Sequence, residues 1–257
     1  MSNRKEQLLA FNRLLDIMDE LREKCPWDKK QTMESLRTLT IEETYELADS
    51  ILNNNLNGIK SELGDLILHI VFYSKIASEI GVFDIGDVLN TICEKLVIRH
   101  PHIYENEVDL DDDQVKKNWE RIKLNEGKKS VLEGVPSSLP ALVKAMRVQE
   151  KVSGIGFDWE NIDQVFEKVE EELLEFKYEI RNNDKGLIEG EFGDVLFSLV
   201  NYARYLNINP ENALDRTNKK FIKRFKYLEN RAKTNNREIS EMSLNEMNII
   251  WNEAKNQ

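Results

Sequence analysis

Cysteine, histidine, glycine and proline are all scarce in this chain of 257 residues. The chain has two cysteines and three histidines, and Cys25 and Cys93 do not form a Cys-x-x-Cys pair. No Ser-His or Cys-His arrangement is evident, which argues against covalent catalysis by a serine or cysteine nucleophile. We interpret both cysteines as reduced, non-catalytic residues, which favours a cytoplasmic location. The 11 glycines and five prolines are few enough for a mostly helical chain.

Sequence signals of several other protein classes are absent too. No Gly-x-x-x-x-Gly-Lys-Ser/Thr motif occurs, so the chain is not a P-loop nucleotide-binding protein. No Glu-x-x-His motif occurs, which argues against a di-iron carboxylate bundle. No apolar run is long enough to span a bilayer, and the residues after Met1 begin an amphipathic helix rather than a signal peptide. We therefore expect no membrane partner.

Acidic residues outnumber basic ones. There are 47 Asp and Glu residues against 36 Lys and Arg residues, and the formal net charge is -11. The phosphates of DNA and RNA favour a basic surface, so we expect no nucleic-acid partner. A nucleotide substrate is still allowed, because metal ions and a few basic side chains can screen its phosphates locally.

Five acidic positions occur twice in the chain, 129 residues apart and without an insertion. Their apolar neighbours repeat with them, which a solvated run of charges would not require. Residues three or four apart share one face of a helix, so each set projects carboxylates from two successive helices. The repeated positions are Glu42, Glu43, Glu46, Glu62 and Asp65, followed by Glu171, Glu172, Glu175, Glu191 and Asp194.

Each set of carboxylates predicts a site for a divalent cation. Glu62 and Asp65 are embedded in the apolar run from Leu63 to Tyr73, where unpaired carboxylates would be costly to bury. A hard cation such as Mg2+, or Mn2+, removes this cost because it prefers oxygen ligands. The predicted ligands are Glu43, Glu46, Glu62 and Asp65 in the first repeat and Glu172, Glu175, Glu191 and Asp194 in the second.

A structural role is the alternative for each single glutamate. Thr40-x-x-Glu43 fits a capping box, so Glu43 could close a helix N-terminus. Glu42 and Glu171 could be ordinary surface acids on amphipathic helices. The recurrence of all five positions favours metal binding over these separate explanations.

Helical spacing of apolar residues runs through the chain, and no useful stretch alternates with the period of two expected of a strand. The sequence therefore predicts an all-α fold. The long repeat favours two tandem helical domains, 1–126 and 141–257, joined by a linker at 127–140 that contains Gly, Ser and Pro. The principal helices are expected over 6–24, 40–53, 57–80, 87–99, 162–181 and 187–206.

Motifs of one family occur along nearly the whole chain, two of them in both repeats. They are Glu-Glu-x-x-Glu at 42–46 and 171–175, Glu-x-x-Asp at 62–65 and 191–194, Cys-Pro-Trp-Asp at 25–28, Arg-His-Pro-His at 99–102 and Gly-Phe-Asp-Trp at 156–159. With these motifs the chain resembles the tandem-repeat MazG nucleoside triphosphate pyrophosphohydrolases.

The resemblance implies an activity and an assembly. The expected activity is Mg2+-dependent hydrolysis of NTPs or dNTPs, ATP included, to the monophosphate and diphosphate, with broad base specificity in house-cleaning or regulatory nucleotide removal. The expected assembly is a homodimer in which two-helix acidic motifs complete four-helix-bundle units. Two alternatives remain: a related all-α dUTPase or phosphoribosyl-ATP pyrophosphohydrolase, and a non-catalytic helical scaffold that binds partners through its acidic faces.

Cations on the third helix of each unit are candidates for binding phosphates. Lys95 and Arg99 are four residues apart and share a helical face, as do Lys220 and Arg224. Lysine offers a point charge and arginine a planar fork of donors to a phosphate. Surface charge on an amphipathic helix is the alternative, and the position after the acidic helices favours substrate binding.

The resemblance assigns further residues to the nucleotide. Asn218 matches an asparagine of the family's nucleotide site, whereas the corresponding residue of the first unit is Cys93. Trp251 is the residue chosen for base contact, with Trp119 as its counterpart in the first unit, because tryptophan can cover any base face. Since only the second unit keeps the asparagine, we expect that unit to carry most of the activity.

Lys168 and Glu171 complete the predicted substrate-binding set. Glu171 or Glu172 is predicted to act as general base and take a proton from the attacking water. These assignments place the predicted catalytic residues on the first acidic helix of the second unit.

Overall fold

The computed structural model describes residues 2–105, 111, 114–115, 118–119, 122 and 130–256. Helices and turns account for these residues, with no β-strand among them, so the all-α prediction is confirmed. By compactness the chain divides into Met1–Val108 and Asp109–Gln257. This division precedes the predicted linker at 127–140, whose first three residues lie outside the described ranges. The predicted domain boundary stays a prediction.

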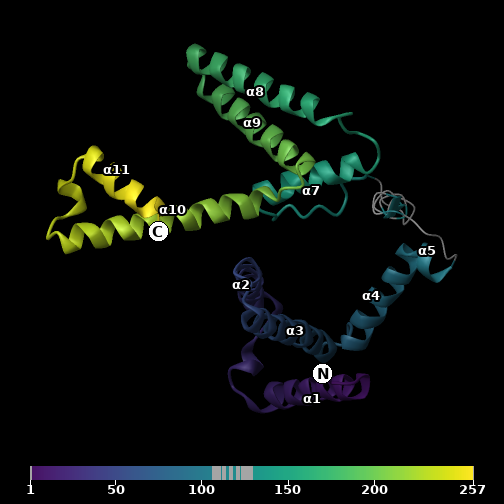
Figure 1. Ribbon diagram of the computed structural model, residues 1–257. Coiled ribbons are helices and arrows are strands. Elements are labelled where there is room, and N and C mark those ends of the chain that lie inside the picture. Colours follow the sequence, from purple (N-terminus) through teal and green to yellow (C-terminus); the bar gives the residue numbers. More distant parts are fainter. Residues whose placement is uncertain are drawn as a thin grey trace. The chain divides into compact units, whose positions relative to one another are not determined.

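The first unit is built on a helical hairpin. Helix α2 packs along α3, and α1 packs against α3 on a core of Met18, Leu36, Val71 and Phe72 (Figure 1). The elements of this unit are α1 (Arg4–Lys24), a 3-10 turn (Asp28–Lys30), α2 (Met33–Leu52), α3 (Leu56–Glu79), α4 (Ile85–Arg99) and α5 (Pro101–Tyr104).

Helix α2 begins earlier than the sequence analysis predicts. Thr32 is its N-cap and forms a reciprocal capping box with Ser35, so the helix starts at Met33 rather than at residue 40. Thr40 therefore lies inside the helix, where its hydroxyl donates to the carbonyl of Leu36 at 3.0 Å. The capping-box explanation for Glu43 is therefore wrong, because Glu43 does not cap the N-terminus of a helix.

The second unit contains a matching hairpin. Helix α8 packs along α9, α7 packs against α9, and α11 lies along α10 (Figure 1). A second apolar cluster, with Leu228, Ala232 and Ile250, holds α11 on α10. The elements are α7 (Ala141–Ser153), α8 (Ile162–Asn182), α9 (Lys185–Tyr205), α10 (Pro210–Thr234), a 3-10 turn (Ile239–Glu241), α11 (Leu244–Glu253) and a last 3-10 turn (Ala254–Asn256).

Several helix ends lie where the sequence predicts them. Asn183 follows α8 with a φ of 61°, a left-handed conformation that asparagine tolerates and that turns the chain into α9. Gly81, with a φ of 68°, follows α3 in the same way. Asn209 caps α10 and Pro210 occupies its first turn, while Ser243 and Glu246 form a capping box at the start of α11.

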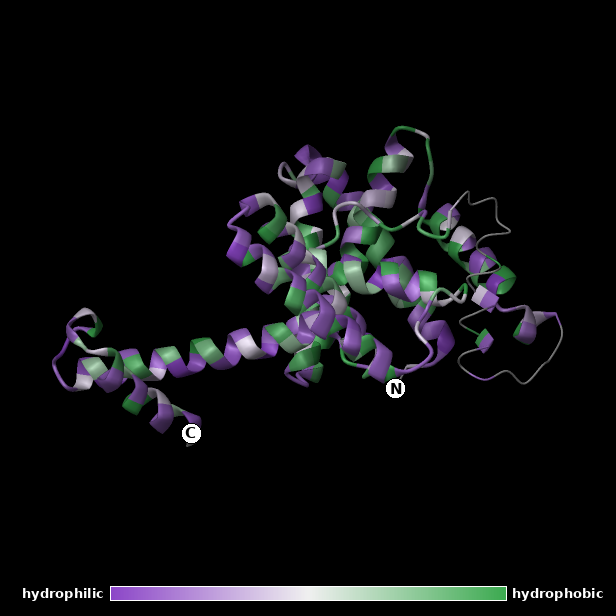
Figure 2. Cartoon of the chain, turned by 90° about the horizontal axis from the view of Figure 1, so that it is seen from above, coloured by the Kyte–Doolittle hydropathy of each residue, from purple (hydrophilic) through white to green (hydrophobic). Residues whose placement is uncertain are grey.

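Helix α10 carries hydrophobic residues along its length between hydrophilic ones (Figure 2). Phe221 and Ile222 are 57% and 51% exposed, although both are large and apolar. Within the described ranges, none of the helices has both the length and the apolar character needed to cross a membrane.

Candidate functional site

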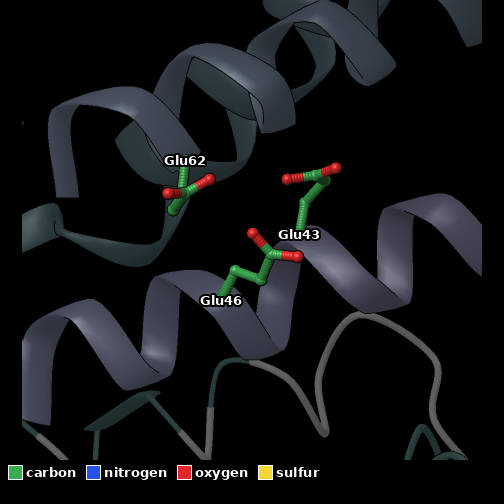
Figure 3. A group of neighbouring side chains, drawn as sticks. All are labelled: Glu43, Glu46 and Glu62. Carbon is green, nitrogen blue, oxygen red and sulfur yellow. The ribbon is translucent and has the colours of Figure 1, made fainter. Parts of the chain in front are cut away.

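The helical hairpin of the first unit brings three carboxylates together. Glu43 and Glu46 project from α2 toward Glu62 on α3 (Figure 3). One carboxylate oxygen from each residue lies within 4.8 Å of the other two. Glu43 and Glu62 are half-buried and Glu46 is exposed. We call these residues the first trio, and oxygen atoms at such separations can share one cation.

The second unit repeats this arrangement on α8 and α9. Glu172, Glu175 and Glu191 each contribute an oxygen within 4.8 Å of the others, and we call them the second trio. Glu172 is buried, at 7% exposed. The matching positions in the two hairpins show that the sequence repeat is also a repeat in space.

The predicted fourth ligand of each set lies beside its trio. Asp65 and Asp194 follow Glu62 and Glu191 by three residues on the same helices. Their negative charges act on the trios, because Asp65 raises the pKa of Glu43 and Asp194 raises the pKa of Glu191. Each hairpin therefore gathers four carboxyl groups in a small volume.

Burial and like charge work against full ionisation of these groups. Desolvation is the main cause of the raised pKa of Glu43, followed by the charges of Asp65 and Glu46. Desolvation is also the main cause for Glu191, followed by the charge of Glu175. The Oε2 atom of Glu191 is buried and accepts no hydrogen bond from any residue that the structure describes. A divalent cation would satisfy this oxygen and offset the repulsion.

Lys168 distinguishes the second site from the first. Its ammonium lies 2.8 Å from Glu172 and 2.9 Å from Glu171, both on the following turn of α8. These two hydrogen bonds raise the pKa of Lys168, and the one with Glu172 has the larger effect. The residue 129 positions earlier is Leu39, so the first hairpin has no equivalent cation. Glu171 is exposed and lies next to the second trio without belonging to it.

The predicted phosphate-binding cations lie on other helices. Lys95 and Arg99 are on α4, whereas Lys220 and Arg224 are on α10 together with the exposed Asn218. In the part of the chain that the structure describes, no hydrogen bond or ion pair joins Lys220 or Arg224 to the second trio. Their contact with phosphates stays a prediction.

Trp251 packs against residues of α10. Its ring centroid lies 5.0 Å from that of Phe221, and the Arg224 guanidinium carbon lies 5.9 Å from the Trp251 ring. The structure therefore joins two predicted nucleotide-binding residues, Arg224 and Trp251, by a cation-π contact. Trp119 is half-buried, but most of the residues on either side of it lie outside the described ranges. Its role in base binding stays a prediction.

A cavity of about 500 Å³ adjoins the second trio. Helices α7, α8 and α9 and the loop at 156–159 form its wall, to which Lys168, Glu172 and Asp194 contribute. Most of its other lining residues belong to none of the sites predicted from the sequence. The Gly-Phe-Asp-Trp motif was the available signal, since it places two aromatic residues in a short loop before the acidic helix.

The loop at 156–159 is fastened to the end of α9. Arg204 forms a two-pronged ion pair with Asp158, with nitrogen-oxygen distances of 2.9 and 2.5 Å, and the Tyr205 hydroxyl donates to Asp158 at 2.8 Å. Burial alone would raise the pKa of Asp158, but hydrogen bonds from Arg204 and Tyr205 and the charge of Arg204 together lower it. The loop is therefore held in a defined position over the cavity.

Comparison with known proteins identifies related sequences. The model of the MazG nucleotide pyrophosphohydrolase domain matches the chain twice, over residues 31–104 and 161–228. A nucleoside triphosphate pyrophosphohydrolase/pyrophosphatase MazG from Thermotoga maritima is 43% identical over 256 residues, and the alignment covers 98% of each chain. A nucleoside triphosphate pyrophosphohydrolase from Escherichia coli K12 is 39% identical, with 96% of this chain and 97% of the relative covered. Both matched ranges contain a carboxylate trio.

Proposed function

Since this chain belongs to the MazG nucleotide pyrophosphohydrolase family, we propose that it hydrolyses nucleoside triphosphates to the monophosphate and diphosphate. The observation that carries this proposal is the second trio, in which two helices bring three carboxylate oxygens within 4.8 Å. The names of the Thermotoga and Escherichia relatives, both nucleoside triphosphate pyrophosphohydrolases, support the same hydrolase activity.

The donor set fits Mg2+, with Mn2+ as the second choice. All three ligand atoms of each trio are carboxylate oxygens, which hard cations prefer. The buried Glu191 Oε2 without a hydrogen bond also fits a cation ligand. When bound, Mg2+ lowers the pKa of a water molecule and neutralises charge on the leaving diphosphate. Glu172, Glu175 and Glu191 would hold it, with Asp194 beside them.

Water is the nucleophile in this proposal, and Glu171 takes its proton. Glu171 lies next to the second trio but outside it, so it is not needed as a metal ligand and can take the proton while Lys168 pairs with its other oxygen; Glu172 is the second candidate. Attack of the water oxygen on the α-phosphorus forms one P-O bond and breaks the bond to the bridging oxygen, which leaves with diphosphate. Lys168 holds Glu171 and Glu172 in position through its two ion pairs.

Phosphate and base contacts are assigned by the sequence pattern. We propose that Lys220 and Arg224 bind the phosphates in the second unit, as Lys95 and Arg99 do in the first. Arg224 and Trp251 form one contiguous surface, which supports a shared role in holding a nucleotide. Broad base specificity follows if the aromatic contacts recognise ring faces rather than particular base edges.

A homodimer is part of the proposal. Phe221, Ile222 and Phe225 on α10 are 57%, 51% and 39% exposed, which favours burial against a second copy. Each two-helix hairpin would then gain partner helices and complete a four-helix bundle. Sedimentation at micromolar concentration should give a dimer, and a monomer would contradict this assembly.

We place the enzyme in the cytoplasm on the basis of its cysteines. Cys25 and Cys93 are both free thiols, as expected in a reducing compartment. This location also fits nucleoside triphosphates as substrates. Retention of activity in buffers containing a thiol reductant would agree with it.

One assay tests the activity and its alternatives. Diphosphate release should be measured for the common NTPs and dNTPs, for dUTP and for phosphoribosyl-ATP, each with Mg2+ and with a chelator. Release from many bases only with Mg2+ is the expected result. Turnover of dUTP or phosphoribosyl-ATP alone would replace the broad activity by a narrow one. No turnover, together with no thermal stabilisation by Mg2+ and nucleotide, would favour the scaffold alternative.

A further inference from the structure

Lys168 places a positive charge directly on the second carboxylate site. Its ammonium nitrogen lies 2.8 Å from Oε1 of Glu172, a member of the second trio, and 2.9 Å from Oε1 of Glu171. The side chain of Glu172 is 10% exposed and that of Lys168 is 34% exposed, so water screens this pair only in part. Its hydrogen bonds to Glu172 and Glu171 raise the pKa of Lys168, so the ammonium keeps its charge at neutral pH. Lys168 thus neutralises a carboxylate that we assign as a ligand for Mg2+.

This ammonium is a feature of the second hairpin and not of the fold. Leu39 stands 129 positions before Lys168, and Glu43 is the counterpart of Glu172. Burial, followed by the charge of Asp65, raises the pKa of Glu43. The first hairpin therefore keeps its carboxylates together without a lysine at this position, so the ammonium is not needed to form the hairpin. Its presence in the second hairpin points to a role in the chemistry there.

A divalent cation in the second trio would compete with Lys168 for Glu172. The trio oxygens lie within 4.8 Å of one another, so a cation that they share would also lie close to the Lys168 ammonium. The repulsion between a double positive charge and an ammonium at such a distance exceeds the free energy that a partly exposed ion pair contributes. Lys168 must therefore leave Glu172 when all three members of the trio hold the cation.

The cavity gives the displaced ammonium a place to go. Lys168 and Glu172 both line this cavity of about 500 Å³, so a rotation of the lysine side chain is enough to bring Nζ into it. Arg204, another basic residue of the wall, is held by Asp158 in a two-pronged ion pair. An ammonium has three hydrogen-bond donors, so Lys168 can keep Glu171 and offer the donor released by Glu172 to another anion.

We propose that Lys168 is an exchangeable counter-ion, which pairs with Glu172 until the cation binds and then donates that hydrogen bond to a phosphate oxygen of the substrate. The inference rests on the proposed function and deepens it, because it couples cation binding to phosphate recognition in the second hairpin. The cation then strengthens phosphate binding twice, by its own charge and by releasing Lys168. The first trio, with Leu39 beside it, lacks this coupling.

Chemical acetylation of lysine tests the exchange without an activity assay. The intact protein is treated briefly with acetic anhydride in a chelator, with excess Mg2+, and with excess Mg2+ plus inorganic triphosphate. Mass spectrometry then compares Lys168 with Lys177, which is exposed on the same helix. Mg2+ alone should raise acetylation of Lys168 about threefold, because the amine loses a carboxylate partner, and triphosphate should lower it again. Acetylation of Lys168 that does not rise with Mg2+ would overturn the exchange.

Calorimetric titration with Mg2+ tests the competition itself. The protein carries Glu46→Ala, so that the first trio does not contribute to the heat, and is compared with and without Lys168→Leu, which introduces the residue of the first hairpin. Mg2+ should bind the Lys168→Leu protein about fivefold more tightly, because no ammonium has to be displaced. Lys177→Leu in the same background is the matched control and should leave the Kd unchanged. Weaker Mg2+ binding in Lys168→Leu would show that the lysine supports the cation site, and would overturn the proposal.

These measurements separate the exchange from the proposed function. No diphosphate release from any NTP by the wild-type enzyme would overturn the hydrolase activity, whatever Lys168 does. Mg2+ binding in the calorimeter without a change in Lys168 acetylation would overturn the exchange alone. No Mg2+ binding by the Glu46→Ala protein would overturn the placement of the cation at the second trio, and the exchange with it.

Discussion

Lys168 Nζ lies 2.8 Å from Glu172 Oε1, one turn further along α8. Lys168 is thus ion-paired with Glu172, a carboxylate that the proposed reaction needs as a ligand for Mg2+. The same ammonium holds Glu171 at 2.9 Å, and the first hairpin has Leu39 in its place. This difference indicates that the two hairpins, although alike in their carboxylates, are not equivalent sites.

Replacing Lys168 should weaken binding of the substrate more than binding of Mg2+. Lys168→Met should raise the KM for ATP by about tenfold, because Lys168 is a predicted substrate-binding residue and its charge-assisted contact with the substrate would be lost. The Mg2+ concentration that gives half-maximal activity should stay the same or fall, since the competing ammonium is gone. Steady-state kinetics with varied ATP and Mg2+ measure both quantities. Lys177→Met, on an exposed position of the same helix, is the matched control and should change neither.

Removing one carboxylate from each trio should show which hairpin is catalytic. Glu175→Ala should reduce kcat/KM by at least about 100-fold, because even groups that merely support a metal ligand are worth roughly 10–100-fold. Glu46→Ala removes the matching carboxylate of the first trio and should leave most of the activity. Diphosphate release by both variants shows which hairpin is catalytic. Loss of activity in Glu46→Ala alone would place the active site in the first hairpin and contradict the prediction.

Thermal stability should respond to pH in opposite ways with and without Mg2+. The raised pKa of Glu191 means that the metal-free fold favours the protonated acid, a contribution present below the ordinary pKa of 4.5 and lost as pH rises through the raised value. Cation binding needs the carboxylate, so the Mg2+-induced increase in Tm should grow from pH 5 to pH 7.5. At Mg2+ concentrations that nearly saturate the site, this increase in Tm should reach about 5 °C.

Two variants control this measurement. Glu191→Gln should flatten the pH dependence of the metal-free Tm and remove most of the Mg2+ effect. Glu189→Gln lies on an exposed position of α9 and should behave like the wild type. An Mg2+ effect that survives in Glu191→Gln would move the cation away from the second trio.

The stability of the loop at 156–159 should depend on the ion pair between Asp158 and Arg204. Asp158→Asn removes the charge that Arg204 and Tyr205 bind, and the free energy of unfolding should fall by about 2 kcal/mol at pH 7. The pKa of Asp158 is lowered, so its contribution is present above the ordinary pKa of 3.8 and is lost as pH falls through the lowered value. Urea unfolding at pH 7 and at pH 3 should show the difference between wild type and variant shrinking in acid. Glu160→Gln, in the same stretch, should have little effect at either pH.

The repeated carboxylates were predictable because helix geometry converts sequence spacing directly into position. Glu172 and Glu175 share a face at a separation of three, and Glu191 follows on the partner helix of the same hairpin. The ion pair of Lys168 with Glu172 follows the same rule at a separation of four, so the sequence contained that signal as well. Local spacing thus accounts for most of the charged site.

Other features depend on choices that local spacing does not determine. The start of α2 was misplaced because Thr40-x-x-Glu43 and Thr32-x-x-Ser35 are competing caps, and packing of Leu36 in the core favours the earlier one. The hydrogen bond from Gln149 Nε2 to the backbone carbonyl of Phe197 was not predicted, because it depends on how α7 packs against α9. Such contacts emerge only when distant helices are brought together.

The second trio draws its ligands from both arms of one hairpin, so a captured cation would act as a removable crosslink between α8 and α9. Local opening of this hairpin would then require release of the ion. Amide hydrogen exchange and protease resistance in α8 and α9 should therefore follow the free Mg2+ concentration, and degradation of the protein in the cell would then depend on the supply of the proposed cation.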